Sequence, residues 1–144
     1  MNKSKNILGI EIGTVIYGKG KGIRKSIRDF EIVVEKHIAY KENKFLYLGD
    51  LDYEGILIYE GLEEEIKENY SIEPFIEGYI KMIDKAQNLN YNLPKSKEKQ
   101  NKNLNGNFLE YFDEKYREKI VKILKSGDYI PQEILNIGDL EYDI

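Results

Sequence analysis

The middle of the chain reads Lys44-Phe45-Leu46-Tyr47-Leu48-Gly49-Asp50-Leu51-Asp52-Tyr53-Glu54-Gly55-Ile56. Its first five residues are mostly apolar and predict a short strand. Residues from about 54 to 69 repeat apolar side chains three or four apart, which predicts a helix. Two carboxylates, those of Asp50 and Asp52, therefore lie where a strand ends and a helix begins. Because residues two apart in an extended chain point to the same side, these carboxylates are expected to converge.

A converging pair of carboxylates has two explanations. It can hold Mg²⁺ or Mn²⁺, because these hard cations take a few oxygen ligands together with water. Alternatively, Asp52 can cap the helix that follows, since Asp is among the residues preferred at a helix N-cap. The spacing alone leaves both readings open.

Residues 49–55, Gly-Asp-Leu-Asp-Tyr-Glu-Gly, are called the acidic motif below. The segments on either side of this motif alternate between strand and helix patterns. Before the motif we expect a β segment over 7–17, with 13–17 as its better strand, then a glycine loop at 18–22 and a helix over about 23–41. After it we expect a turn or short third strand at 71–74 and helices over about 74–87 and 108–125. The last of these helices should stop at 126–127, and a short helix should begin at Pro131. This alternation predicts an α/β fold with a small, mostly parallel sheet flanked by helices and with extra C-terminal helices. Ligands in such folds bind beyond the carboxyl ends of the strands.

Length and composition narrow the function classes. The chain has 144 residues, which fits one domain. We expect a core over 1–88, a polar loop over 89–106, and helices and a tail over 107–144 that complete the same domain. The absence of cysteine excludes a disulfide framework and a thiolate metal site, and the single histidine excludes a site built on two imidazoles. No apolar window is long enough to span a membrane, so we expect a cytoplasmic protein that does not contact membranes.

Charge is distributed unevenly along the chain. Residues 1–30 hold seven Lys or Arg and two acids, whereas the remainder holds fifteen and twenty-four. The glycine loop and the start of the helix expected after it carry much of the early positive charge, in Lys19, Lys21, Arg24 and Lys25. Cations, glycine and backbone N–H groups at the start of a helix suit a DNA phosphate. The competing reading is a tight turn with solvated lysines.

The acidic motif also resembles a known family. Residues 45–56 are similar to the Asp-x-Asp strand and following helix of Toprim domains, and the Gly-Asp-x-Asp-x-x-Gly-Ile form is most similar to the branch of the topoisomerase VI A subunit. Within that branch it resembles the C-terminal domain of JetD, the nuclease subunit of Wadjet plasmid-defence systems. Residues 15–20 resemble that family's second strand and glycine turn, and residues 129–133 resemble a segment near its end.

This resemblance implies a function and a set of roles. It implies a DNA-cleaving domain of a plasmid- or phage-defence protein, dependent on Mg²⁺ or Mn²⁺, with Asp50 and Asp52 as catalytic metal ligands and with DNA and other subunits of a defence complex as partners. The family also uses a glutamate from its first strand. Glu11 is the candidate for that role, but its spacing from the glycine turn leaves no room for the usual helix. We therefore expect a chain that begins inside the domain, with its first strand missing or atypical.

Two further expectations concern the C-terminus and assembly. Glu133, or its neighbour Gln132, is a candidate third ligand or orienting group near the acidic pair. The alternative is that Glu133 only stabilises the first turn of a short helix. If the first strand is missing, the exposed strand edge favours a homodimer. The competing functional hypothesis is a non-catalytic DNA-binding or assembly module derived from a Toprim domain, and a weaker one is a primase-like phosphotransfer enzyme.

Overall fold

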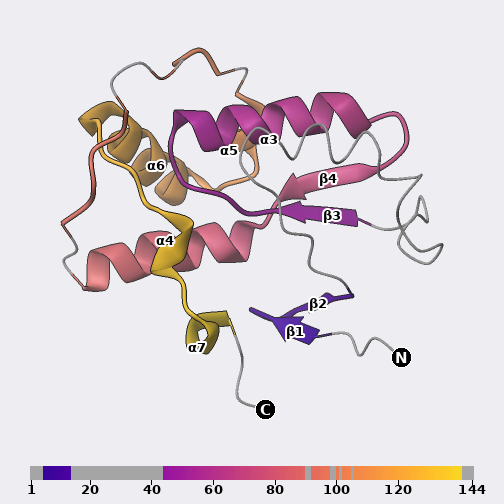
Figure 1. Ribbon diagram of the computed structural model, residues 1–144, viewed down its shortest axis with the longest axis horizontal. Coiled ribbons are helices and arrows are strands. Elements are labelled where there is room, and N and C mark those ends of the chain that lie inside the picture. The colour runs from indigo at the N-terminus through magenta and orange to yellow at the C-terminus, as the bar shows by residue number, and fades with distance from the viewer. Residues whose placement is uncertain are drawn as a thin grey trace.

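The computed structural model describes residues 5–13, 44–89, 92–97, 100, 102–104 and 106–140 (Figure 1). In chain order these residues form β1 (Lys5–Ile7), β2 (Ile10–Ile12), β3 (Lys44–Tyr47), α3 (Tyr53–Ile66), β4 (Ser71–Pro74), α4 (Ile76–Asn88), α5 (Asn107–Glu110), α6 (Glu114–Ser126), the 3₁₀ helix η1 (Gln132–Ile134) and α7 (Ile137–Leu140). The described residues therefore form a mixed α/β domain, as predicted.

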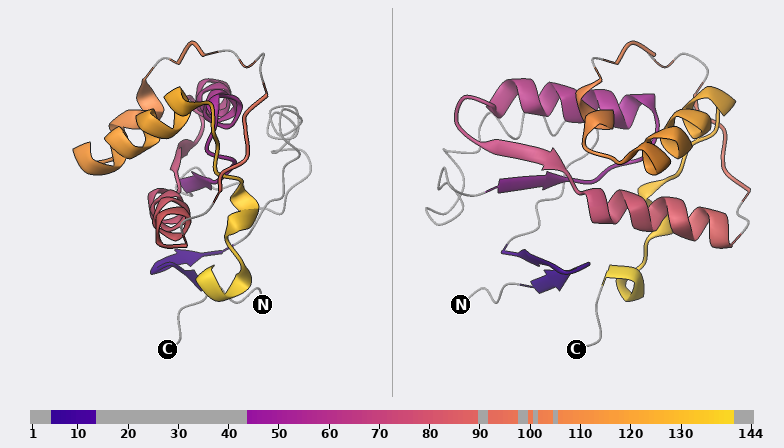
Figure 2. Two further views of the ribbon diagram at one scale, coloured as in Figure 1. Left: turned by 90° about the vertical axis from the view of Figure 1, so that its left-hand side faces the viewer. Right: turned by 180° about the vertical axis from the view of Figure 1, so that it is seen from behind.

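A parallel strand pair lies at the centre of the described structure. β3 and β4 run parallel, with Phe45 opposite Ile72 and Tyr47 opposite Pro74. The chain crosses between them through α3, as parallel strands require. Figure 2 shows α3 on one side of the pair and α4 on the other. Parallel pairing was predicted, and among the described residues the parallel sheet has these two strands.

The segment from Ser71 to Pro74, expected as a turn or a short strand, is a strand. Pro74 was expected to open the next helix, but it pairs with Tyr47 at the end of β4. The Phe75 N–H then donates to the Tyr47 carbonyl at 2.7 Å, which extends the ladder by one residue. This pairing delays the start of α4 to Ile76.

The N-terminal β prediction is confirmed for Ile10–Ile12, but the arrangement of this segment was not predicted. Instead of one β segment starting at Ile7, the structure forms an antiparallel hairpin of β1 and β2. Leu8 and Gly9 occupy its turn with φ values of 51° and 83°, and two positive φ angles are what a tight two-residue hairpin turn needs. The Asn6 side chain accepts the Gly9 N–H at 3.0 Å. The predicted strand at 13–17, the glycine loop and the helix over 23–41 lie outside the described residues, apart from Gly13.

The helix expected over 108–125 is two helices. α5 ends at Glu110, and α6 begins after Asp113, whose side chain accepts the Tyr116 N–H at 2.9 Å. A polar residue that caps a helix start competes with a continuous helix, which explains the break. The predicted stop is confirmed, because Gly127 ends α6 in the left-handed region at φ 79°.

One hydrophobic core joins these elements. Its fully or nearly fully buried side chains come from α3, α4, α5 and α6 and from the segments after β3, α5 and α6. They include Leu51, Ile56, Tyr59, Leu62, Tyr79, Met82, Ile83, Phe108, Phe112, Ile120 and Ile130. Phe108 contacts the rings of Tyr59, Tyr79 and Phe112, whose centroids are 5.1–5.7 Å away. No helix of the described residues has the length and apolar character needed to cross a bilayer.

An ion pair fastens α7 to α4. Lys85 Nζ lies 2.6 Å from Asp139 Oδ2, and both side chains are less than one fifth exposed. The Asn136 N–H also donates to Asp139 Oδ2, at 2.8 Å. Lys85 and this N–H lower the pKa of Asp139 below its ordinary value, because they stabilise the charged carboxylate.

We predict that Asp139→Asn lowers the free energy of unfolding by a few tenths to about 1 kcal/mol near pH 7, since the amide keeps the shape but loses the charge. A lowered folded-state pKa means that this contribution is present above pH ~4 and is lost as the pH falls through the folded-state pKa. The difference between wild type and variant, measured by urea denaturation from pH 7 to pH 3, should therefore shrink with acidification. A difference that is constant over this range would contradict the prediction.

Candidate functional site

Asp50 lies three residues after the end of β3, and two hydrogen bonds hold it and its backbone in place. The preceding Gly49 N–H donates to the Tyr79 hydroxyl oxygen at 3.0 Å, and Tyr79 is fully buried in α4. Asp50 Oδ1 accepts the backbone N–H of Gln132 at 2.9 Å. One contact fixes the backbone before Asp50 and the other fixes its carboxylate.

Asp52 is the N-cap of α3, which agrees with the capping alternative. Its Oδ1 accepts the Gly55 N–H at 2.6 Å, while its Oδ2 accepts the side-chain amide of Gln100 at 3.0 Å. The residue is only 7% exposed. Capping uses one carboxylate oxygen and leaves the other directed toward the polar segment that contains Gln100, so capping and ligand binding are compatible.

The residue between the two acids joins the motif to the C-terminal part of the chain. The Leu51 N–H donates to the Ile130 carbonyl at 2.8 Å, and the Ile130 N–H donates back at 3.3 Å. Both side chains are fully buried. This antiparallel bridge brings η1, and with it Gln132, beside Asp50.

Burial dominates the electrostatics of the motif. It raises the pKa of Asp52, and the negative charges of Asp50 and Glu54 raise it further, whereas the hydrogen bonds from Gly55 and Gln100 lower it. Asp50 and Asp52 are therefore close enough to repel each other. A bound cation would relieve this repulsion, because an opposite charge favours the ionised form of both groups.

Two tyrosines whose hydroxyl groups contact the backbone of the motif stay neutral. Burial is the main cause of the raised pKa values of Tyr47 and Tyr79, and the charge of Asp50 adds to it in both. The Tyr47 hydroxyl donates to the Gly55 carbonyl at 3.0 Å. These phenols support the backbone around the acids, and their burial does not suit a role as nucleophiles.

Gly55 explains the spacing of the Gly-Asp-x-Asp-x-x-Gly motif. A Cβ atom at this position would overlap the backbone oxygen of Asp50 and come within 3.1 Å of Asp52 Oδ1. Only glycine lets the first turn of α3 approach the strand end this closely. The glycine of the motif is therefore required by packing, whereas its two aspartates supply the chemical groups.

The chemistry of the donors fits a magnesium or manganese ion. Asp50 and Asp52 supply carboxylate oxygens at one strand end, and Mg²⁺ sites often use one or two carboxylates together with water and substrate phosphate. Within the part of the chain that the structure describes, no group of three or more His, Cys, Asp or Glu side chains could enclose an ion. The residues therefore fit an open site rather than a closed structural one.

The two candidate glutamates lie in different places. Glu133 is in η1, next to the residue whose N–H contacts Asp50. Glu11 lies in β2, and Figure 1 shows the β1–β2 hairpin on the far side of α4 from α3. Neither glutamate joins the two aspartates in a group of three acids within the described residues.

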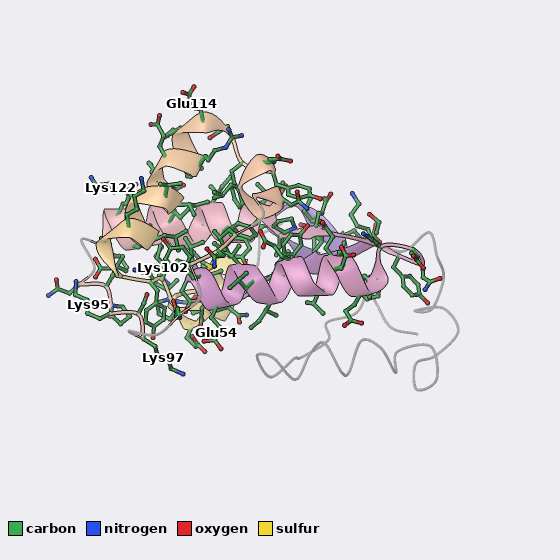
Figure 3. The ribbon with its side chains drawn as sticks, turned by 90° about the horizontal axis from the view of Figure 1, so that it is seen from above. Glu54, Lys95, Lys97, Lys102, Glu114 and Lys122 are labelled. Atoms are coloured by element: carbon green, nitrogen blue, oxygen red, sulfur yellow. The ribbon has the colours of Figure 1, made fainter. Side chains whose placement is uncertain are left out.

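The predicted phosphate-contacting residues Lys19, Lys21, Arg24 and Lys25 lie outside the described residues. Other lysines lie near the acidic motif. Figure 3 shows Lys97 and Lys102 on the segment that passes the N-terminal end of α3, where Glu54 lies. Both lysines are exposed, and the hydrogen bond from Gln100 to Asp52 anchors this segment to the motif.

Sequence reasoning missed three contributors to the site. Tyr47 and Tyr79 were identified only as strand and core residues, although their hydroxyl groups bind the backbone of the motif. Gln100 lies in a polar segment without periodicity, so no sequence signal could have connected it to Asp52. Gln132 was identified, but it contacts Asp50 through its backbone N–H, a group that every residue other than proline has.

One family model matches nearly the whole chain. It is the model described as Wadjet protein JetD, C-terminal, and it covers residues 4–143. No curated protein and no solved structure matches the chain.

We predict that Gly55→Ala destabilises the domain by about 3 kcal/mol, because the added methyl group overlaps the carbonyl of Asp50 and forces a backbone shift. An ordinary glycine to alanine change in a helix would stabilise it by about 0.5–1 kcal/mol. Gly13→Ala is the matched control, since a Cβ there would meet nothing within 4 Å. Chemical denaturation gives both values. Equal stability of Gly55→Ala and wild type would show that the turn can shift without cost.

Proposed function

Because this chain belongs to the family of the C-terminal domain of the Wadjet protein JetD, we propose that it is a Toprim-like, Mg²⁺-dependent DNA-cleaving domain of a plasmid-defence complex. The observation that carries the proposal is the arrangement at the end of β3. There Asp50 and Asp52 interact electrostatically and offer oxygen ligands at the N-terminus of α3. The strand, crossover helix and parallel strand around them agree with a Toprim-like core.

Asp50 and Asp52 would hold the ion. When bound, Mg²⁺ or Mn²⁺ would stabilise negative charge on the scissile phosphate. The Gln132 N–H fixes the Asp50 carboxylate, and the Gly55 N–H fixes that of Asp52. Both contacts pre-orient the ligands before an ion arrives, which reduces the entropic cost of binding.

Glu133 is the stronger of the two candidates for a general acid or base. It lies one residue from Gln132, in the segment that the Leu51–Ile130 bridge brings to the motif. Glu11 lies in β2, on the far side of α4 from α3 (Figure 1). The cleavage proposed is hydrolysis, in which water adds to phosphorus and one P–O ester bond breaks.

Positive charge near the acids would bind the DNA backbone. Lys97 and Lys102 are exposed on the segment anchored at Asp52, and the cations of the glycine loop are further candidates from the sequence. Phosphate contacts of this kind are independent of sequence and weaken with salt. Other subunits of the defence complex would supply the remaining DNA contacts, and a homodimer stays a candidate assembly.

One observation favours a second candidate function. Among the described residues, no group of three acids at the motif could hold a metal ion, which would suit a DNA-binding or assembly module that has lost catalysis. This module would retain the lysines and the fold without cleaving DNA.

The discriminating experiment incubates supercoiled plasmid with the purified chain and Mg²⁺ or Mn²⁺. We expect nicking by wild type and at least a 100-fold loss in Asp50→Asn and Asp52→Asn, since each variant keeps the shape of the side chain but loses a charged ligand. Glu64→Gln is the control, because Glu64 is an exposed acid of α3 that pairs with Lys67. It should cleave like wild type.

Three other outcomes of this experiment would contradict the cleavage proposal. Equal nicking by wild type and both aspartate variants would identify a contaminating nuclease and remove the proposal. DNA binding without nicking, seen by gel shift with and without metal, would support the binding module instead. The absence of both binding and nicking would contradict both functions.

A further inference from the structure

The side-chain amide of Gln100 is only half satisfied. Its Nε2 donates to Asp52 Oδ2 at 3.0 Å. Its Oε1 is buried and has no hydrogen-bond partner in the described structure. A buried amide oxygen without a partner costs about 1–3 kcal/mol, so native proteins keep few of them and each calls for an explanation.

The position of this oxygen suggests its missing partner. It belongs to the same amide that already contacts Asp52, a proposed metal ligand. Amide oxygens of Asn and Gln are common ligands of hard divalent cations, together with carboxylates and water. A cation within reach of Asp52 would therefore satisfy the one unpaired atom of Gln100.

We propose that Gln100 is a third oxygen ligand of the divalent ion held by Asp50 and Asp52. The proposal rests on the metal site of the proposed function and adds a protein ligand from outside the acidic motif. It also provides the third donor that the nearby acids do not supply, without adding negative charge where Asp50 and Asp52 already repel each other.

This role would couple the ion to the lysine-bearing segment. Gln100 lies between Lys97 and Lys102 in the sequence. Farther back, the segment is fixed to the chain after α6, because the Ser96 N–H donates to the Gly127 carbonyl at 2.8 Å and the Tyr129 N–H donates to the Pro94 carbonyl at 3.1 Å. An ion bound to Gln100 would strengthen the attachment that its hydrogen bond to Asp52 already provides, and it would hold Lys97 and Lys102 near the N-terminal end of α3 (Figure 3).

The test measures Mn²⁺ binding by electron paramagnetic resonance, which reports free ion and needs no DNA cleavage. The variants of the full chain are Gln100→Leu, Gln100→Glu, Asp52→Asn and Gln87→Leu. The last is the control, since Gln87 contacts Lys119 on α6 and not the motif. We expect Gln100→Leu to weaken binding about 10-fold, a typical loss for a group that supports a metal site. Gln87→Leu should bind like wild type.

Gln100→Leu separates a ligand from a simple hydrogen-bond donor, because losing only a donor would free Asp52 Oδ2 for the ion and would not weaken binding. Gln100→Glu keeps an oxygen for the ion and adds a negative charge, so it should bind Mn²⁺ at least as tightly as wild type. Weaker binding by Gln100→Glu would contradict the proposal. Thermal unfolding in EDTA checks that each variant is folded, and a folded Gln100→Leu with unchanged or tighter binding would overturn the proposal.

The same data set distinguishes the failure of this inference from that of the proposed function. Unchanged binding in Asp52→Asn, or no binding by wild type, would remove the metal site itself. Weakened binding in Asp52→Asn combined with wild-type binding in Gln100→Leu would leave the site intact and exclude only Gln100 as a ligand.

Discussion

The site depends on the pair of backbone hydrogen bonds between Leu51 and Ile130. Leu51 separates the two acids, and its peptide is held to the C-terminal segment by both its N–H and its carbonyl. Because both side chains are fully buried, the bonds form away from water, where breaking them would leave unpaired polar groups. This bridge places the Gln132 N–H on Asp50 and makes residues about 80 positions away part of the motif.

A second constraint is the close approach of α3 to the end of β3. Gly55 allows it, and Asp52 uses it to cap the helix. The Tyr79 hydroxyl accepts the Gly49 N–H before the acids, and the Tyr47 hydroxyl donates to the Gly55 carbonyl after them. The acids thus lie at the edge of a core that fixes them before any ligand binds. Such preorganisation is what a functional site on rigid elements requires.

Burial of Asp52 has a cost that points to function. Burial and the charge of Asp50 disfavour its ionised form, yet this position carries a carboxylate although an asparagine would also cap the helix. Gln100 adds an unpaired amide oxygen at the same place. Residues that reduce stability at one edge of a fold are characteristic of functional sites. The divalent cation of the proposed function would offset both costs.

The amino-acid sequence by itself determined the local elements and the chemistry of the motif. Apolar periodicity predicted β3, α3 and α4 to within a few residues, and the spacing of Asp50 and Asp52 predicted two acids at a strand end. These features follow from interactions between neighbours in the chain. Local preference did not predict the break before α6 or the N-terminal hairpin, because capping by Asp113 and the turn at Leu8 and Gly9 compete with continuous patterns. Gln132 was expected near the acids, but only the tertiary structure put its backbone N–H on Asp50 and brought Gln100 and Tyr79 to the motif. Those contacts join residues 30 to 82 positions apart, and polar groups without periodicity carry no sequence signal of what they will touch.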